Sequence, residues 1–317
     1  MLDIQLHNLL EGMRASGAPD FADLPPAAAR ELYSQILARG DVPVADVVIE
    51  ERRIDGPGSE LVLRIYRPRG SGGVRGAVLY LHGGGFVVGR PQDYDGVASV
   101  LCAQADCVLV QVDYRLAPEH PFPAAVDDSY AALVWLAAHA GELGIDPARI
   151  AVAGDSAGAN LATVCAILAR DRGGPALVRQ VLIYPVTAPE PGMFDSYRRH
   201  GEGYTLTSRS AWYFTELYLG GRRAVTDFRV APLFADELGG LPPALVLVAG
   251  YDPLRDEGIA YADKLAAAGT HVTLVVYAGL AHGFISMGGA LDAARIAVDQ
   301  VASVLRRALA ANTSERA

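Results

Sequence analysis

Lysine is almost absent from this sequence. Lys264 is the only lysine, so 26 of the 27 basic side chains are arginines. Lys264 stands in no nucleotide-binding or Schiff-base motif, which disfavours ligands that need such a lysine. The 36 acidic residues bring the formal net charge to −9. Because an acidic protein repels phosphate backbones, we do not expect a nucleic-acid partner.

Cysteine is scarce as well, and no hydrophobic run is long. Cys102, Cys107 and Cys165 form no CxxC pair and no cysteine–histidine cluster, so we expect buried, reduced thiols and no metal site. No apolar run approaches the roughly 18 residues that span a bilayer. The first residues also lack the charged and apolar regions of a signal peptide. The expectation is a cytoplasmic protein without a membrane span.

Apolar runs alternate with helical patterns along most of the 317 residues. This alternation is typical of an α/β fold, with a mostly parallel sheet flanked by helices. The predicted strands are Val44–Glu51, Leu61–Tyr66, Ala77–Leu81, Val108–Val112, Ile150–Ala153, Gln180–Tyr184, Ala244–Ala249 and Val272–Tyr277. The predicted helices between and after them are Asp93–Gln104, Pro123–Ala140, Ala159–Arg170, Asp256–Ala268 and Leu291–Ala311. A turn at Asp55–Gly58 favours an antiparallel start to the eight-stranded sheet.

Two segments do not follow this alternation. Residues 1 to about 43 are predicted to form two or three amphipathic helices before any strand. Residues 187 to about 225 lie between two strands and are rich in aromatic side chains, which favours a helical insertion. Either segment could pack as ordinary core or cover a ligand site.

The segment Gly154-Asp155-Ser156-Ala157-Gly158 matches the GxSxG pattern of a nucleophilic serine. It follows a predicted strand and opens a predicted helix, which is the context that this pattern requires. Side chains two positions before and after the serine would be crowded on such a sharp turn, which explains the two glycines. The competing interpretation is an ordinary helix with Ser156 as its N-cap.

A serine nucleophile needs a base and an acid that orients the base. Among the seven histidines, His282 is the candidate base, because it lies in a predicted loop five residues beyond the last strand's end at Tyr277. Parallel sheets assemble active sites in such loops. Asp252 is the candidate acid, since it lies just after the end of the preceding buried strand, Ala244–Ala249. Its competitor, Asp256, is interpreted as a first-turn anion of the next helix.

The run His82-Gly83-Gly84-Gly85-Phe86 directly follows a predicted strand. Consecutive glycines let backbone amides approach a carbonyl oxygen without obstruction by a Cβ atom. Gly83, Gly84, Gly85 and the amide of Ala157 are therefore the candidate oxyanion hole. A phosphate-binding loop is disfavoured because no GxGxxG or GK[S/T] pattern is present. His82 is interpreted as a hydrogen-bonding support of this loop.

With these motifs the sequence resembles the bacterial hormone-sensitive-lipase family of α/β hydrolases, in its Gly-Asp-Ser-Ala-Gly branch. The chain order Ser156, Asp252, His282 is the order of that fold. Four blocks carry the resemblance and stand in the family's order: His82–Phe86; Asp113–Glu119 with Phe122–Ala125; Gly154–Asn160; and Asp252–Glu257 with His282–Phe284.

The resemblance implies a carboxylesterase that uses no cofactor and acts on a small-molecule ester. In the family the second and third glycines of the loop, here Gly84 and Gly85, usually supply the oxyanion donors. The family also implies a discontinuous helical cap, here residues 1–43 and 187–225, on a catalytic domain of residues 44–186 and 226–317. Homodimers that use the last strand or helix are frequent in the family.

Other functions remain open at this point. An amidase, formamidase or peptidase could use the same residues, and a non-catalytic small-molecule receptor or a protein-interaction role would need only the fold. A haloalkane dehalogenase is disfavoured because it needs aspartate at position 156. A cap should restrict the acyl pocket to short and medium chains, with walls predicted from the aromatic residues Phe86, Trp212, Tyr213 and Phe214.

Overall fold

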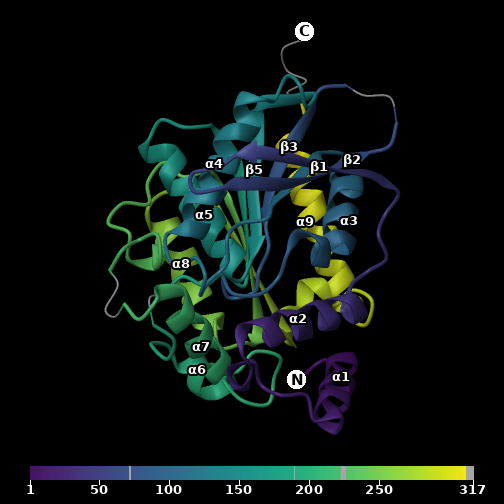
Figure 1. The fold of residues 1–317 in the computed structure, drawn as a ribbon, viewed down its shortest axis with the longest axis vertical. Coiled ribbons are helices and arrows are strands. Elements are labelled where there is room, and N and C mark those ends of the chain that lie inside the picture. Colours follow the sequence, from purple (N-terminus) through teal and green to yellow (C-terminus); the bar gives the residue numbers. More distant parts are fainter. Residues whose placement is uncertain (71–72, 189, 223–225, 312–317) are drawn as a thin grey trace.

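An eight-stranded sheet runs through the middle of the molecule (Figure 1). The computed structural model describes residues 1–317 apart from 71–72, 189, 223–225 and 312–317. The strands are β1 (Val47–Asp55), β2 (Glu60–Pro68), β3 (Arg75–Leu81), β4 (Val108–Val112), β5 (Ile145–Asp155), β6 (Leu177–Ile183), β7 (Ala244–Tyr251) and β8 (Val272–Ala281). Their order across the sheet is β1-β2-β4-β3-β5-β6-β7-β8. Only the β1–β2 and β2–β4 pairs of this sheet are antiparallel.

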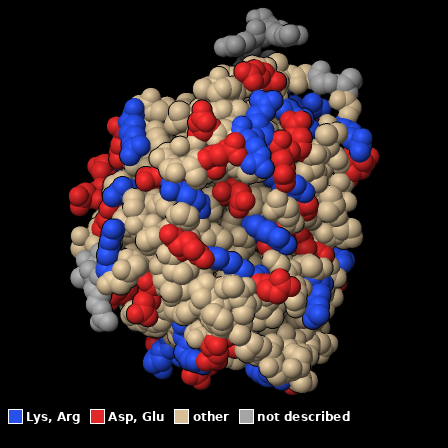
Figure 2. All heavy atoms as spheres, viewed as in Figure 1, with Lys and Arg blue, Asp and Glu red and all other residues tan. Residues whose placement is uncertain are grey.

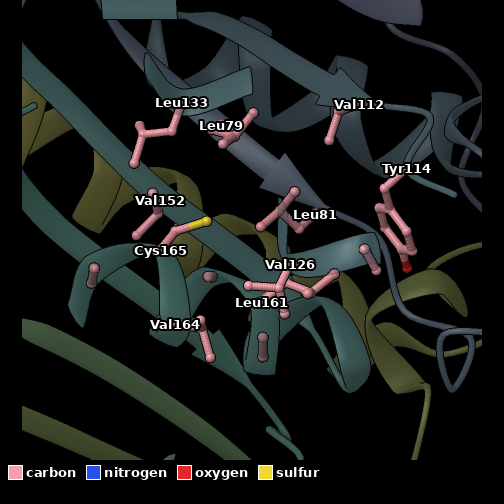
Figure 3. Packing of buried hydrophobic residues seen from close by; sticks show 14 of the residues in the cluster. Leu79, Leu81, Val112, Tyr114, Val126, Leu133, Val152, Leu161, Val164 and Cys165 are labelled. Atoms are coloured by element: carbon pink, nitrogen blue, oxygen red, sulfur yellow. The ribbon is translucent and has the colours of Figure 1, made fainter. Parts of the chain in front are cut away.

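Helices cover both faces of the sheet, as a largely parallel sheet requires. One face carries α3 (Asp95–Ala105) and α9 (Asp292–Leu309), and the other carries α4 (Ala124–Ala138), α5 (Ala157–Asp171) and α8 (Arg255–Ala267) (Figure 1). Figure 3 shows how the second face packs: Leu79, Leu81 and Val152 of the sheet meet Leu161, Val164 and Cys165 of α5. The central strands are apolar on both faces because both are buried.

The remaining helices gather at one end of the sheet (Figure 1). They are α1 (Ile4–Ser16) and α2 (Pro26–Gly40) before the sheet, and α6 (Asp195–His200) and α7 (Ser208–Leu219) between β6 and β7. Short 3-10 segments also occur at η1 (Phe21–Asp23), η2 (Pro91–Tyr94), η3 (Pro232–Phe234) and η4 (Phe284–Ser286). The two parts meet where the Asp20 carboxylate accepts hydrogen bonds from the Thr207 and Ser210 hydroxyls.

The first residues of the chain dock on its last elements. The Asp3 amide donates to the carbonyl of Gly279 in β8 at 3.0 Å. The Gln5 side chain exchanges hydrogen bonds with the carboxylate and the amide of Asp292, the first residue of α9. The amino-terminal helix is thus held by residues that come almost three hundred positions later.

The predicted sheet is confirmed, with differences at strand ends. The antiparallel hairpin between β1 and β2 is present, and β4 has its predicted bounds. The prediction that the last strand ends at Tyr277 is wrong, because β8 continues to Ala281. A register shift between Ala249 and Tyr251 of β7 lets the pairing extend to Ala281. His282 therefore directly follows the strand rather than lying in a longer loop.

The charged side chains are spread over the surface, and the three cysteines lie in the interior. Acidic and basic side chains are intermixed on the face drawn in Figure 2, where red and blue spheres alternate. Cys102, Cys107 and Cys165 are buried free thiols, as predicted. Within the described residues, no helix is long and apolar enough to cross a membrane.

Candidate active site

The predicted site residues lie at the carboxyl ends of four neighbouring or near-neighbouring parallel strands. His82 follows β3, Ser156 follows β5, Asp252 follows β7 and His282 follows β8. Carboxyl ends of parallel strands meet at one edge of a sheet. The topology therefore brings together residues that are up to 200 positions apart in sequence.

Ser156 stands on a sharp turn between β5 and α5. Its backbone has φ 55° and ψ −119°, a conformation that residues with a Cβ atom rarely adopt. A Cβ atom on Gly154 would lie 2.4 Å from the carbonyl oxygen of Gly158, and one on Gly158 would lie 1.9 Å from that of Leu81. Both positions admit only a hydrogen atom, which confirms the steric interpretation of the two glycines.

Ser156, His282 and Asp252 form a continuous hydrogen-bonded row. The His282 Nε2 atom lies 2.9 Å from the Ser156 hydroxyl, and its Nδ1 atom lies 2.8 Å from Oδ2 of Asp252. A carboxylate can only accept, so the Nδ1 hydrogen points at Asp252 and the Nε2 lone pair points at Ser156. This tautomer is the one that can take a proton from the serine.

Asp252 is oriented by its own backbone turn and excluded from water. It is 0% exposed, and its second oxygen accepts the Leu254 amide at 2.8 Å. Its competitor Asp256 lies in the first turn of α8, where it accepts from the Arg255 side chain and the Ser196 amide. The structure therefore brings Asp252, and not Asp256, to the histidine.

The glycine loop offers two free amides beside the serine turn. Gly84 has φ 113° and Gly85 has φ 59°, conformations that glycine adopts without strain. The amide of Gly83 is already engaged, because it donates to Oδ1 of Asp155 at 2.9 Å. Within the part of the chain that the structure describes, the amides of Gly84, Gly85 and Ala157 donate to no protein acceptor. Of the predicted donors, Gly83 is therefore the one that the structure does not leave available.

His82 holds the glycine loop through its side chain. Its Nδ1 atom donates to the Gly83 carbonyl at 2.7 Å, and its ring stacks on Tyr114 with centroids 4.3 Å apart. Burial lowers the pKa of His82 to about 4, so the ring is neutral at neutral pH. In the described residues, no three histidine, cysteine or carboxylate side chains gather as a metal site.

Two of the predicted aromatic walls, Phe214 and Phe86, lie at the glycine loop, and a third, Tyr213, contacts the amino-terminal arm. Phe214 of α7 packs on Gly85, where an added Cβ atom would meet its ring at 2.5 Å. Phe86 stacks on Tyr218 of the same helix, with centroids 3.7 Å apart. Tyr213 donates from its hydroxyl to the Leu24 carbonyl and so ties α7 to the amino-terminal arm.

Trp212 departs from the prediction. It is 49% exposed and lies on a different side of α7 from the buried residues Ala211, Phe214 and Tyr218. These three follow the i, i+3, i+7 spacing of one helical face, whereas Trp212 is rotated by about 100° from Ala211. The structure therefore does not bring Trp212 to the site.

Three residues that lie at the site were not identified from the sequence. The ring of Tyr184, at the end of β6, lies 4.5 Å from that of His282, and its backbone has φ 37°. The Thr205 hydroxyl donates to the His282 carbonyl at 2.6 Å. The Asp155 carboxylate accepts from the Gly83 amide, Tyr80 and Tyr94. Only Asp155 carried a signal, since it stands inside the serine motif.

A serine on a strand-to-helix turn, a histidine and a buried aspartate at the edge of a largely parallel sheet define the α/β-hydrolase class of fold. The family described as alpha/beta hydrolase fold matches residues 78–286, and the chain belongs to it. Within this class, it is a member of the bacterial hormone-sensitive-lipase group that the motifs indicated.

Named relatives agree with this placement. The chain is 42% identical over 298 residues to the carboxylic ester hydrolase LipN of Mycobacterium tuberculosis, covering 90% of this chain and 77% of the relative. It is 38% identical to the ethyl acetate hydrolase of Pseudomonas putida, covering 87% of each chain. The crystal structure of a thermostable esterase from Pseudomonas putida ECU1011 superposes with a TM-score of 0.94 at 34% identity, covering 98% of both chains.

Proposed function

We propose that this protein is a serine carboxylesterase that hydrolyses short- to medium-chain carboxylic esters through an acyl-enzyme on Ser156. The observation that carries the proposal is the row Ser156–His282–Asp252, with hydrogen-bond distances of 2.9 and 2.8 Å. Relatives across the family are named as carboxylic ester hydrolases, carboxylesterases and an arylesterase, which supports the same reaction class.

In the first half-reaction, His282 Nε2 takes the proton of Ser156 as its oxygen attacks the ester carbonyl. The developing oxyanion accepts hydrogen bonds from the amides of Gly84, Gly85 and Ala157. Each such donor contributes on the order of 3 kcal/mol to transition-state stabilisation. His282 then passes its proton to the leaving alcohol. Asp252 stays ionised throughout and stabilises the imidazolium.

In the second half-reaction, water replaces the alcohol. His282 takes a proton from the water, which attacks the acyl carbonyl, and the same amides hold the second oxyanion. Collapse of this intermediate returns the proton to Ser156 and releases the carboxylic acid. No cofactor is needed for either step.

The proposed cap consists of residues 1–43 and 187–225. Its described helices α1, α2, α6 and α7 gather at one end of the sheet (Figure 1). Phe214 and Phe21 lie 5.7 Å apart between centroids, and Phe214 packs directly on Gly85. Aromatic rings this close to the oxyanion loop leave little room for a bulky acyl group, which favours short chains.

The cellular location, the substrate and the oligomeric state are predicted as follows. The buried free thiols fit a reducing compartment, so a cytoplasmic location is expected. The substrate is expected to be a small, neutral ester, and a homodimer is expected from the family. Cross-linking or sedimentation of the purified chain would measure its oligomeric state directly.

The central experiment replaces the nucleophile. Ser156→Ala should reduce hydrolysis of p-nitrophenyl butyrate by at least about 10³-fold. A fluorophosphonate probe should label one serine in the wild-type chain and none in the variant. Ser303→Ala is the control: this serine lies in α9, outside the candidate site, and the variant should keep wild-type activity and labelling. Activity of Ser156→Ala within tenfold of wild type would contradict the proposal.

The acyl-chain preference is measured with p-nitrophenyl esters from C2 to C16. Turnover should be highest for short and medium chains, and tributyrin should be hydrolysed far faster than an olive-oil emulsion. Phe214→Ala should shift the optimum towards longer chains. A wild-type optimum at C12 or above would contradict the proposed substrate class, and hydrolysis of anilides but not of esters would favour an amidase.

A further inference from the structure

A row of three side chains connects helix α2 with the glycine loop. The Tyr33 hydroxyl of α2 lies 2.6 Å from the hydroxyl of Tyr94, at the end of η2. The Tyr94 hydroxyl reaches Oδ2 of Asp155 at 3.4 Å, and Oδ1 of Asp155 accepts the Gly83 amide at 2.9 Å. Tyr94 is 0% exposed and Asp155 only 3%, so water competes little for these contacts.

The direction of these hydrogen bonds follows from their chemistry. An ionised carboxylate only accepts, so Tyr94 donates its one hydrogen to Asp155. The hydrogen between the two tyrosines must then come from Tyr33. Burial raises the pKa of Asp155 to about 6, while Tyr80, the Gly83 amide, His282 and Tyr94 act against that rise. The carboxylate is therefore ionised at neutral pH, and the row is polarised from α2 towards the loop.

The Gly83 amide stands directly before the two amides that are proposed as oxyanion donors. Gly83 precedes Gly84 and Gly85, and a Cβ atom added to it would lie 2.4 Å from Asp155. On the other side, the Gly84 carbonyl accepts the amides of Val87 and Val88 at 3.0 and 2.9 Å. The two amides proposed as oxyanion donors are thus held between a side-chain contact and a backbone turn.

We infer that Tyr33 is a positioning residue for ester hydrolysis: through Tyr94 and Asp155 its hydroxyl holds the Gly83 amide and so aims the amides of Gly84 and Gly85 at the oxyanion. This inference rests on the proposed function. It assigns to α2 a part in transition-state stabilisation, in addition to covering the site. An interaction that is made only when the oxyanion forms affects kcat and leaves KM nearly unchanged.

Helix α2 offers a matched control one residue further on. The Ser34 hydroxyl donates to Oδ2 of Asp93 at 2.9 Å, so it also ties α2 to η2. Asp93 is in turn contacted by Arg90 and not by Asp155. Ser34→Ala therefore removes a similar contact between the same two elements without interrupting the row.

The experiment measures kcat and KM for p-nitrophenyl butyrate in Tyr33→Phe, Tyr94→Phe, the double variant and Ser34→Ala. Loss of a hydrogen bond to a charged group should lower kcat of Tyr94→Phe roughly tenfold. Tyr33→Phe should lower kcat roughly threefold, since it acts through a neutral hydroxyl. KM should stay within about twofold, and Ser34→Ala should match wild type. Affinity for a trifluoromethyl ketone that forms a hemiketal should fall in parallel with kcat.

The double variant separates a connected row from two independent contacts. If Tyr33 acts through Tyr94, the double variant should have the same kcat as Tyr94→Phe alone. Multiplying effects, or equal losses in Tyr33→Phe and Ser34→Ala, would overturn the inference. If Tyr94→Phe does not fold, the comparison of Tyr33→Phe with Ser34→Ala decides alone. Fluorophosphonate labelling of Ser156 is measured in every variant, because its absence in the wild type would count against the proposed function instead.

Discussion

Ser156 is held in a backbone conformation that its neighbours determine. Conformations of this kind cost about 1–3 kcal/mol and persist where the surrounding structure fixes them. Here the Ser156 amide donates to the Ile183 carbonyl at 2.8 Å, and Gly154 and Gly158 pack against backbone oxygens. The strain therefore presents the hydroxyl to His282 in the ground state, before any substrate binds.

Sequence patterns predicted the positions of the proposed triad better than those of the residues that support it. Ser156, Asp252 and His282 each stand next to an apolar strand, and strand ends can be located from hydrophobic patterns. Asp155, Tyr94 and Tyr33 come from three elements that meet only through tertiary packing. Asp155 stands inside the serine motif, but nothing in the sequence near these three residues indicates that they meet, so their contact could not be predicted.

The choice between the two aspartates can be tested at this scale. Asp252→Asn should lower kcat on the order of 10³–10⁴-fold, because the amide would donate to Nδ1 and leave Nε2 protonated. Asp256→Asn should cost less than about tenfold, since Asp256 bonds Arg255 and the Ser196 amide instead. Steady-state kinetics with p-nitrophenyl butyrate measures both. A larger loss in Asp256→Asn would reassign the acid.

At the scale of elements, Asp20 joins the amino-terminal arm to α7 by hydrogen bonds. Its carboxylate caps η1 and also accepts from Thr207, the N-cap of α7, and from Ser210. Desolvation opposes the charge, but these hydrogen bonds together hold the pKa of Asp20 below its ordinary value. The position of Phe214 over the glycine loop therefore depends on a contact about 190 residues apart in sequence.

Removing that carboxylate should loosen the arm. Asp20→Ala should lower the free energy of unfolding by about 1–3 kcal/mol at pH 7, measured by urea denaturation. Because the pKa is lowered on folding, the loss should disappear as the pH falls below about 4. Asp23→Ala is the control: its pair with Arg209 is exposed on both sides and should contribute less than about 1 kcal/mol. Equal losses in both variants would contradict this role of Asp20.

A second contact between elements depends on pH. Glu257 of α8 is 0% exposed and accepts from the Thr187 and Ala188 amides and from Tyr197. Burial raises its pKa to about 8 from 4.5 despite these bonds. Because the pKa of Glu257 is higher in the folded state than in the unfolded state, this side chain contributes stability that is fully present below the unfolded pKa. That contribution is lost as the pH rises through about 8.

Glu257→Gln should therefore flatten the dependence of stability on pH. Between pH 5 and 8.5, the free energy of unfolding should fall at least about 1 kcal/mol more in the wild type than in the variant. Glu142→Gln, an exposed glutamate paired with Arg52, is the control and should follow the wild type. Parallel curves for the wild type and Glu257→Gln would show that Glu257 does not titrate on this scale.

For the whole molecule, the fold was predictable and several bounds were not. Periodicity identified the eight strands of the sheet because their segments are apolar runs or alternations. β5 begins five residues earlier than predicted, since the polar segment Asp146–Arg149 reads as a turn although Ile145 pairs with Arg75 of β3. β8 likewise continues beyond its predicted end at Tyr277, because the register shift in β7 lets the pairing reach Ala281. Pairing partners, which lie far away in sequence, decided both.

The net charge of −9 acts at the scale of the whole surface. Neutral esters feel little of this field, so kcat/KM for p-nitrophenyl butyrate should vary by less than about twofold between 20 and 300 mM NaCl. A dianionic ester of similar size should react more slowly at low salt and recover as salt screens the repulsion. Stopped-flow or steady-state assays across the salt series measure the contrast. Faster reaction of the dianion at low salt would indicate a local basic patch at the site entrance.

The docking of the first helix on the last elements has a consequence for how the protein is made. A ribosome finishes the nucleophile turn long before it adds His282, and Asp3 has no Gly279 carbonyl to bond until the final strand emerges. The nascent chain must therefore keep its leading segment undocked while most of the sheet assembles. With the proposed triad, ester turnover should begin only when synthesis is nearly complete, so activity in a translation reaction should report full-length folded chains and not truncated ones.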